Sequence, residues 1–169
     1  MKGTRARALR AAAAALAAGA AAALVSGCGA SSGGRGATAQ QRESAANLAG
    51  LIDQLHEDLT VTEVEGDSLA AARRALRSYP HQVAALVAFG DFGSCLTMVR
   101  NAGLPEGRLQ RVATTLATAC RLLQGAADLY TVAEKSGDPE ELLRATDRAL
   151  AALPLLFRAR AQLDAARRA

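Results

Sequence analysis

The sequence predicts an all-α protein, an up-and-down bundle of four long helices with one short connecting helix. Apolar residues recur every three or four positions in long stretches between residues 40 and 163, as on one face of a helix. Proline, glycine and aspartate stand between these stretches, where helices begin and end. The β-branched segment TVTEVEG, residues 60–66, lacks clean alternation, and we expect a loop or a short extended piece there.

The first long helix is expected over residues 40–59. Its apolar stripe consists of Leu48, Leu51, Ile52, Leu55 and Leu59. A short helix follows over residues 68–78, capped by Asp67 or Ser68. The dipeptide Tyr79-Pro80 ends this helix, because proline disfavours helical geometry in the residue before it and suits the first turn of the next helix.

The next helix is expected over residues 80–102, with Gly103 as its C-cap. It contains Gly90 and Gly93, each of which costs about 1 kcal/mol relative to alanine inside a helix. The two glycines therefore predict either a bend or a close approach of another helix backbone.

Pro105 and Glu106 are expected to open the longest helix. Its apolar stripe consists of Leu109, Val112, Leu116, Ala119, Leu123, Ala126 and Tyr130, widened by Leu122, Leu129 and Val132. A helix that is apolar on more than one side is central to a bundle. The segment KSGDPEE, residues 135–141, predicts the next break, with Gly137 as C-cap and Asp138 as N-cap. The last helix carries Pro154, which we expect to kink it.

Residues 1–27 have the layout of a secretory signal that is removed from the mature protein. The basic start contains Lys2, Arg5, Arg7 and Arg10 and no acid. The apolar run over residues 11–25 is too short to span a bilayer comfortably. Since no twin-arginine pair precedes that run, we expect the general secretory route.

The end of this segment, Val25-Ser26-Gly27-Cys28, resembles the lipobox of bacterial lipoprotein precursors. The resemblance implies that the signal is cut before Cys28, that the sulfur of Cys28 receives a diacylglyceryl group, and that acyl chains such as palmitate hold the protein on membrane lipid. Residues 28–40, rich in glycine, serine and alanine, are expected to form a flexible tether. Residues 41–169 are then the helical domain. In some double-membraned bacteria, an aspartate directly after the lipidated cysteine retains a lipoprotein at the inner membrane. Gly29 occupies this position here, so that retention signal is absent.

The expected location is the outer face of the cytoplasmic membrane, or the outer membrane in a double-membraned host. The net charge of +4 does not indicate nucleic-acid binding. Residues 1–27 hold four of the 20 lysines and arginines and none of the 16 acids, which leaves 16 of each in the mature chain. A neutral, exported chain argues against a nucleic-acid partner.

Cys95 and Cys120 are the candidate disulfide, because an exported pair of thiols is ordinarily oxidised. In a tight hairpin turning at about Leu104 the two residues would be offset by about 10 Å along the helix axes. A bend at the glycines or a late start of the second helix would remove this offset. Two free buried thiols and a redox or metal role are the alternatives.

His56, His81 and Met98 are weak ligand candidates, and no metal-binding spacing connects them, so we expect no metal site and no cofactor. Asp91 and Asp128 fall near apolar stripes, where carboxylates more often pair with arginine than act in catalysis. Neither a nucleophile elbow nor a phosphate-binding loop is present in the sequence, and we expect no enzymatic activity.

The sequence therefore favours a membrane-anchored, non-enzymatic helical lipoprotein that acts as an interaction or scaffold module on an envelope protein. The alternative is a carrier or sensor for a lipid, haem or metal, which would need an apolar pocket lined by several helices. Arg158, Arg160, Arg167 and Arg168 make the last helix basic. They either complete a helix C-terminus or attract anionic headgroups beneath the tether.

Overall fold

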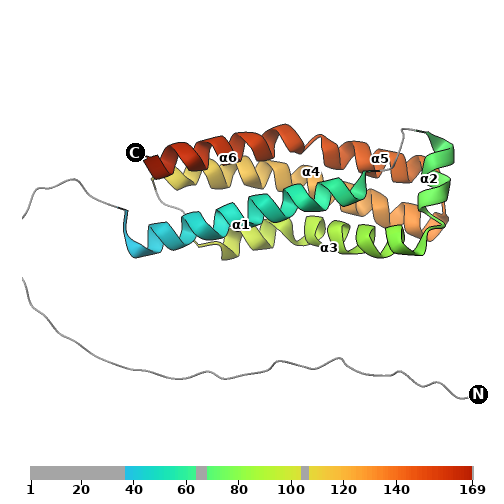
Figure 1. Cartoon of the computed structure of the whole chain (residues 1–169), viewed down its shortest axis with the longest axis horizontal. Coiled ribbons are helices and arrows are strands. Elements are labelled where there is room, and N and C mark those ends of the chain that lie inside the picture. The colour runs from blue at the N-terminus through green and yellow to red at the C-terminus, as the bar shows by residue number, and fades with distance from the viewer. Residues whose placement is uncertain (1–36, 64–67, 104–106, 169) are drawn as a thin grey trace, which may run out of the picture. The chain divides into compact units, whose positions relative to one another are not determined.

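The structure, a computed structural model, describes residues 37–63, 68–103 and 107–168. Within these ranges it contains six helices and no strand. The helices are α1 (Ala39–Thr62), α2 (Leu69–Ala75), α3 (Tyr79–Asn101), α4 (Arg108–Ser136), α5 (Pro139–Leu150) and α6 (Leu153–Arg168). Because α5 and α6 follow each other end to end, the chain forms four long antiparallel rods and the short α2, which confirms the predicted fold class (Figure 1).

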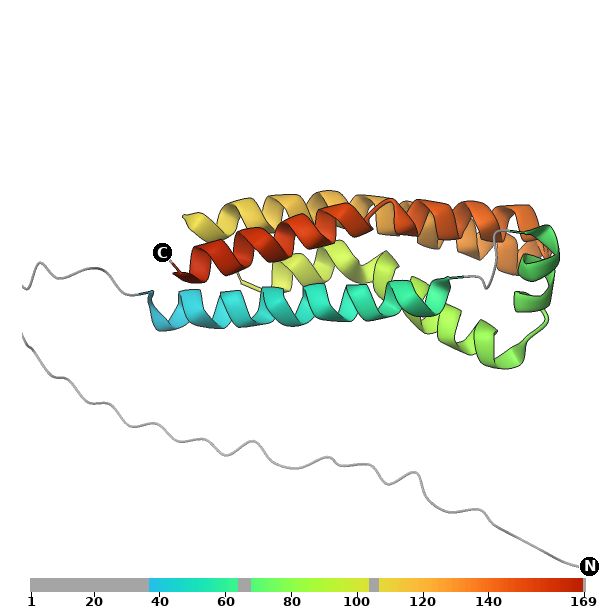
Figure 2. The same ribbon diagram turned by 45° about the horizontal axis from the view of Figure 1, so that its top comes forward.

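The four rods form a bundle in which each rod is flanked by two antiparallel neighbours. α3 packs between α1 and α4, and α6 packs between the same two helices on the opposite side. α3 and α6 therefore lie diagonally across the bundle (Figures 1 and 2). The short α2 lies across one end, against α5. The other end gathers the first turns of α1 and α4 and the last turns of α6.

α1 begins within the segment expected to be tether and ends later than expected. Thr38 and Gln41 form a reciprocal capping box, so the helix starts at Ala39. The expected loop at residues 60–66 is wrong for its first three residues, since α1 continues to Thr62. Thr62 is buried and its carbonyl accepts a hydrogen bond from the Thr146 hydroxyl of α5. This tertiary contact outweighs the strand preference of the β-branched residues.

The boundaries of α2 and α3 follow their local signals. The Ser68 side chain caps α2 by accepting from the Ala71 N–H at 3.2 Å, while Asp67 lies outside the described residues. α3 begins at Tyr79 with Pro80 in its first turn, and Gly103 follows its end with a φ of +107°, a conformation that favours glycine.

α4 begins later than expected. Pro105 and Glu106 lie outside the described residues, and the described helix starts at Arg108 after Gly107, whose φ is +59°. At its other end the predicted break is confirmed, because Gly137 adopts the left-handed conformation and its N–H bonds to the Ala133 carbonyl at 2.8 Å.

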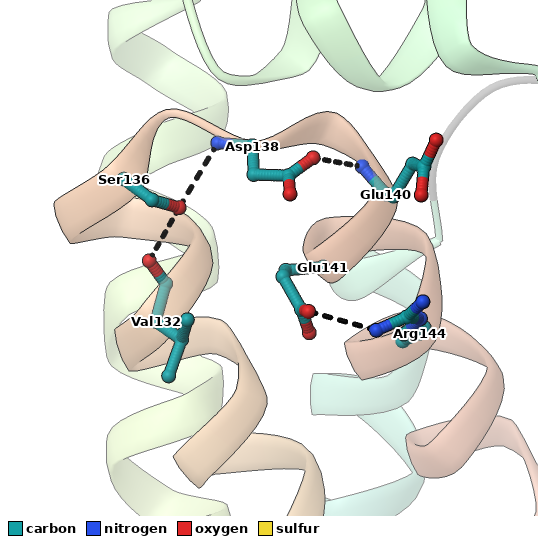
Figure 3. A network of polar contacts seen from close by, with 6 residues as sticks. All are labelled: Val132, Ser136, Asp138, Glu140, Glu141 and Arg144. Atoms are coloured by element: carbon teal, nitrogen blue, oxygen red, sulfur yellow. Dashed lines mark hydrogen bonds and ion pairs between the residues drawn. The ribbon is translucent and has the colours of Figure 1, made fainter.

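Figure 3 shows how the break between α4 and α5 is capped on both sides. The Ser136 hydroxyl donates to the Val132 carbonyl and accepts from the Asp138 N–H. The Asp138 carboxylate then accepts from the Glu140 N–H at 2.9 Å. The last carbonyls of α4 and the first N–H groups of α5 are thus satisfied within a few residues.

The expectation of a kinked last helix is corrected to a full interruption. α5 ends at Leu150, Ala151 and Ala152 form a turn, and α6 starts at Leu153. Pro154 has no N–H to donate to the preceding turn, so it ends the first helix and sits in the first turn of the second, where that N–H is not needed.

The core is continuous along the bundle, and alanine is its most frequent residue. The largest fully buried side chains include Phe92, Leu48, Leu55, Leu116, Leu123, Leu142, Leu156 and Leu163. Phe89 stacks on Tyr130 with ring centroids 4.3 Å apart and meets Phe92 edge-on at 5.4 Å. Small alanines between these large side chains let the helices approach closely.

Candidate functional site

Cys28, the expected lipidation site, lies outside the described residues, as do the rest of the lipobox and the signal over residues 1–27. The expected disulfide is present: Cys95 of α3 and Cys120 of α4 are bonded, with their Cα atoms 5.3 Å apart. Both residues are fully buried. The bond is therefore a covalent crosslink inside the core.

The offset expected for a tight hairpin appears at the ends of the two helices and not at the cysteines, which lie level with each other. The midpoint between the two cysteines falls between Gly107 and Arg108, at the first turn of α4. From the level of the disulfide, α4 extends twice as many residues as α3, so its first turn projects about 9 Å beyond the end of α3. That first turn packs beside α6 instead (Figure 2).

The weak ligand candidates are not brought together. His56 lies exposed on α1 and meets the Phe157 ring of α6 edge-on at 5.4 Å. His81 lies in the first turns of α3, where burial lowers the pKa of its imidazole and its Nε2 has no hydrogen-bond partner among the described residues. Met98 packs against the core near the opposite end of α3. Within the described ranges, no cluster of three or more His, Cys, Asp or Glu side chains is arranged to hold a metal ion.

Asp58, two residues after His56, is the most perturbed carboxylate among the described residues. It lies on the α1 side of the seam between α1 and α3, and its Oδ2 is buried without a partner among the described residues. Burial, and then the negative charges of Asp91 and Glu57, raise the pKa of the Asp58 carboxyl to about 6. The sequence alone does not predict this raised pKa, because the shift depends on burial and on Asp91, which lies on a different helix.

Asp91 and Asp128, for which pairing with arginine is the more common role, form no ion pair among the described residues. Asp91 is half-buried and accepts a hydrogen bond from the Gln54 amide of α1 at 2.7 Å. Asp128 lies exposed on α4. The ion pairs that the described residues do form involve Arg144 with Glu141, and Arg160 with Asp53 and Asp164.

The outward face of α3 carries half of the exposed large apolar side chains among the described residues. Its exposed large apolar side chains are Tyr79, Val83, Leu86 and Val87, which are 76, 45, 54 and 60 % exposed. From Tyr79 to Thr97 no exposed residue of this helix carries a charge. Among the described helices, α3 is long and apolar enough to cross a membrane by length and composition, with a mean hydropathy of 1.5, and only a third of that stretch is buried.

The glycines of α3 belong to this outward face. A Cβ atom at Gly90 would meet nothing within 4 Å, and one at Gly93 would make only ordinary contact with Ala127 at 3.9 Å. Of the two alternatives expected at these glycines, a bend or a close approach of another helix backbone, the close approach is therefore not found among the described residues. Because Gly90 has no side chain, it leaves an opening between the apolar side chains of this face. No packing among the described residues requires a glycine there.

A shallow, open depression lies between the first turn of α4 and the last turns of α6. It is lined by Gly107, Arg108, Arg111, Gln162, Ala165 and Ala166. The lining combines two arginines and a glutamine with glycine and alanine, and it has none of the leucine, valine or phenylalanine side chains typical of a pocket for an apolar ligand or haem. Arg108 and Arg111 can donate hydrogen bonds to an anion there.

Comparison of the chain with known protein families, curated proteins and solved structures finds no match. The features that bear on its function are the sequence Val25-Ser26-Gly27-Cys28 that resembles a lipobox, the buried disulfide, the outward face of α3 and the distribution of charge.

Replacing both Cys95 and Cys120 with alanine is expected to lower the free energy of unfolding by about 3.5 kcal/mol, the chain-entropy value for this loop. Urea denaturation measures the difference. Adding a reductant to the native protein should reproduce most of the loss, and adding it to the double variant should change nothing. Both thiols reacting with iodoacetamide in the unreduced, unfolded protein would contradict the bond.

Replacing Asp58 with asparagine is expected to stabilise the protein by about 1 kcal/mol at pH 8, after the shift is reduced for the partial exposure of the group, and to have little effect at pH 4. The pKa of the folded state is above the unfolded value of 3.8, so the protonated carboxyl favours folding below that value. This contribution is lost as the pH rises through about 6. Urea denaturation at both pH values measures it, with exposed Asp128→Asn as the control. An equal gain at both pH values would contradict the assignment.

Proposed function

We propose that this chain is a bacterial lipoprotein, anchored through acylated Cys28, whose helical domain is a non-enzymatic interaction module at the outer face of the cytoplasmic membrane. In a double-membraned host the outer membrane is the alternative location. The outward face of α3 is the surface offered to an envelope protein. The uncharged, unburied character of that face is the observation that carries the proposal.

Two features support the anchored, exported state. The lipobox follows a basic segment and an apolar segment in the order that lipoprotein precursors use. The buried disulfide agrees with an oxidising compartment, since cytosolic thiols are kept reduced. Each buried methylene of an acyl chain contributes about 0.8 kcal/mol to membrane binding, so two or three chains hold the protein without a spanning helix.

The interaction role is supported by the two unequal faces of α3. The inward face contributes Ala85, Phe89, Phe92, Cys95 and Val99 to the core. The outward face has a second apolar stripe with the same helical spacing. The solvent-facing side of a bundle helix is ordinarily polar, so packing within the bundle does not explain this stripe. Contiguous exposed apolar surface of this kind marks an interaction site.

The flanks of this face favour a protein over a bilayer as its partner. On the α1 side lie Glu57 and Asp91, close enough to raise the Asp58 pKa. On the α4 side lies Glu134, whose charge, after burial, raises the pKa of the Tyr130 hydroxyl. That hydroxyl donates to the Gln82 carbonyl of α3 at 3.4 Å. Carboxylates on both flanks oppose contact with anionic lipid and suit a helix that has an apolar stripe and basic edges.

The arrangement of the titratable groups supports a non-enzymatic role. His56 and His81 lie on different helices, and the perturbed Asp58 lies in a seam between α1 and α3 rather than beside a described nucleophile. Acid–base catalysis needs such groups within hydrogen-bond reach of one reacting atom.

Replacing Cys28 with alanine is expected to abolish acylation and to move the protein out of the lipoprotein fraction extracted by detergent. Mass spectrometry of the amino-terminal peptide and membrane fractionation measure both effects. Ser26→Ala keeps a small residue in the lipobox and should behave as the native chain. Unchanged acylation and fractionation of the Cys28 variant would reject the anchor.

A photo-crosslinking residue at Val87 is expected to form a protein adduct in intact cells, because this position is at the centre of the outward face. The matched control is the same residue at exposed Ala161, on the diagonally opposite α6. Gly90→Leu should reduce the adduct at least about fivefold by filling the opening in the face. Gly50→Leu alters a glycine on α1 that also has nothing within 4 Å, and should leave the adduct unchanged.

Equal yields at Val87 and Ala161, or equal effects of the two leucine variants, would contradict the assignment of this face. Adducts with lipid alone would assign the face to the bilayer instead.

A further inference from the structure

The end of the bundle at which α1 begins carries a concentration of positive charge. Five exposed arginines lie in the first turns of α1 and α4 and the last turn of α6: Arg42, Arg108, Arg111, Arg167 and Arg168. The acids in these described turns are Glu43 and Asp164, and Asp164 lies 3.7 Å from Arg160. We call this surface the basic end.

The turns that form the basic end are in contact with one another. The Arg167 guanidinium donates to the Ala45 carbonyl at 2.9 Å, which joins the end of α6 to the start of α1. The first turn of α4 and the last turns of α6 share the shallow depression that Arg108 and Arg111 line. The arginines therefore belong to one surface.

The helix dipole favours some of these arginines at their positions and disfavours others. Arg167 and Arg168 stand at a helix C-terminus, where cations are favourable. Arg108 and Arg111 stand in the first turn of α4, where the helix dipole disfavours a cation. That turn has no acidic residue, and Gly107 provides no side-chain cap. The described first turn of the longest helix thus carries two positive side chains and no acid.

The start of α5 at the other end of the bundle follows the opposite rule. Asp138 caps it, and Glu140 and Glu141 occupy its first turn (Figure 3). The same chain thus places acids in the first turn of α5 and arginines in the first turn of α4. The difference indicates that the α4 start is adapted to an anionic surface outside the protein.

We propose that the basic end docks on the anionic surface of the bilayer, with the α4 N-terminus and Arg108 and Arg111 facing lipid phosphates. This inference rests on the proposed anchoring at Cys28. Ten residues, 29–38, separate Cys28 from α1. Such a segment spans about 17 Å on average and about 35 Å at most, so it keeps this end of the bundle nearest the lipid.

Docking at the basic end orients the bundle with its long axis pointing away from the membrane surface. Each arginine brought to an anionic surface strengthens the association about fivefold at moderate ionic strength. α3 then runs away from the bilayer, and its outward apolar face is open sideways to an envelope protein. The anchor sets the distance from the membrane, and the charges set the orientation.

The test uses the protein purified from membranes and reconstituted into vesicles of phosphatidylcholine, or of phosphatidylcholine and phosphatidylglycerol in a three-to-one ratio. A fluorophore is attached at Ala165→Cys in the basic end or at Lys135→Cys near the other end. A nitroxide on the lipid headgroup quenches a fluorophore that touches the surface. We expect quenching at Ala165→Cys in the anionic vesicles, and much less at Lys135→Cys.

Arg108→Gln with Arg111→Gln is expected to lower the docked population on the order of tenfold, as is high salt. Arg73→Gln with Arg74→Gln makes the same charge change on α2, at the other end of the bundle, and should have no effect. Equal quenching in the two lipid mixtures, or equal effects of the two arginine pairs, would overturn the proposal. Mass spectrometry of the same sample reports acylation of Cys28, so failure of the anchor and failure of docking are seen separately.

Discussion

The bond between Cys95 and Cys120 fixes the register on which the rest of the surface depends. It joins α3 to α4 at a fully buried point, so it determines both which side of α3 faces the core and how far α4 extends. With Cys95 inward, Phe92 and Val99 point inward on the same stripe, and Leu86 and Val87 point outward. The same register carries the first turn of α4 past the end of α3.

The alanine-rich core explains why one whole apolar face remains outside. Close-packed helices need little side-chain volume between them, and Phe89, Phe92 and Tyr130 fill the space on the inward side of α3. The second stripe of α3 has no place in that core. A surface that is uncharged over this length exposes apolar area to water, which a partner would remove.

The two surfaces have different chemistry and lie in different places. The outward face of α3 is apolar with carboxylates on its flanks, whereas the basic end presents arginines from three helices. An anionic bilayer matches the second and is repelled by the first. Because these surfaces are separated along the bundle, the two proposed contacts, with lipid at the end and with protein along the side, do not compete for the same residues.

The sequence by itself determined the helices, because periodicity, capping residues and prolines act within a few residues of each other. The caps at Thr38, Ser68 and Asp138 and the break before α5 are local features of this kind. The lipobox is also local, so the prediction of an anchor at Cys28 comes from the sequence alone.

Tertiary structure alone decided the late start of α4, the continuation of α1 to Thr62 and the raised Asp58 pKa. It also decided which stripe of α3 is exposed and that arginines from three helices meet at one end. These features depend on the register between segments that are far apart in the chain. The sequence pattern defines the apolar and polar faces of each helix, but it does not specify which face the neighbouring helices cover.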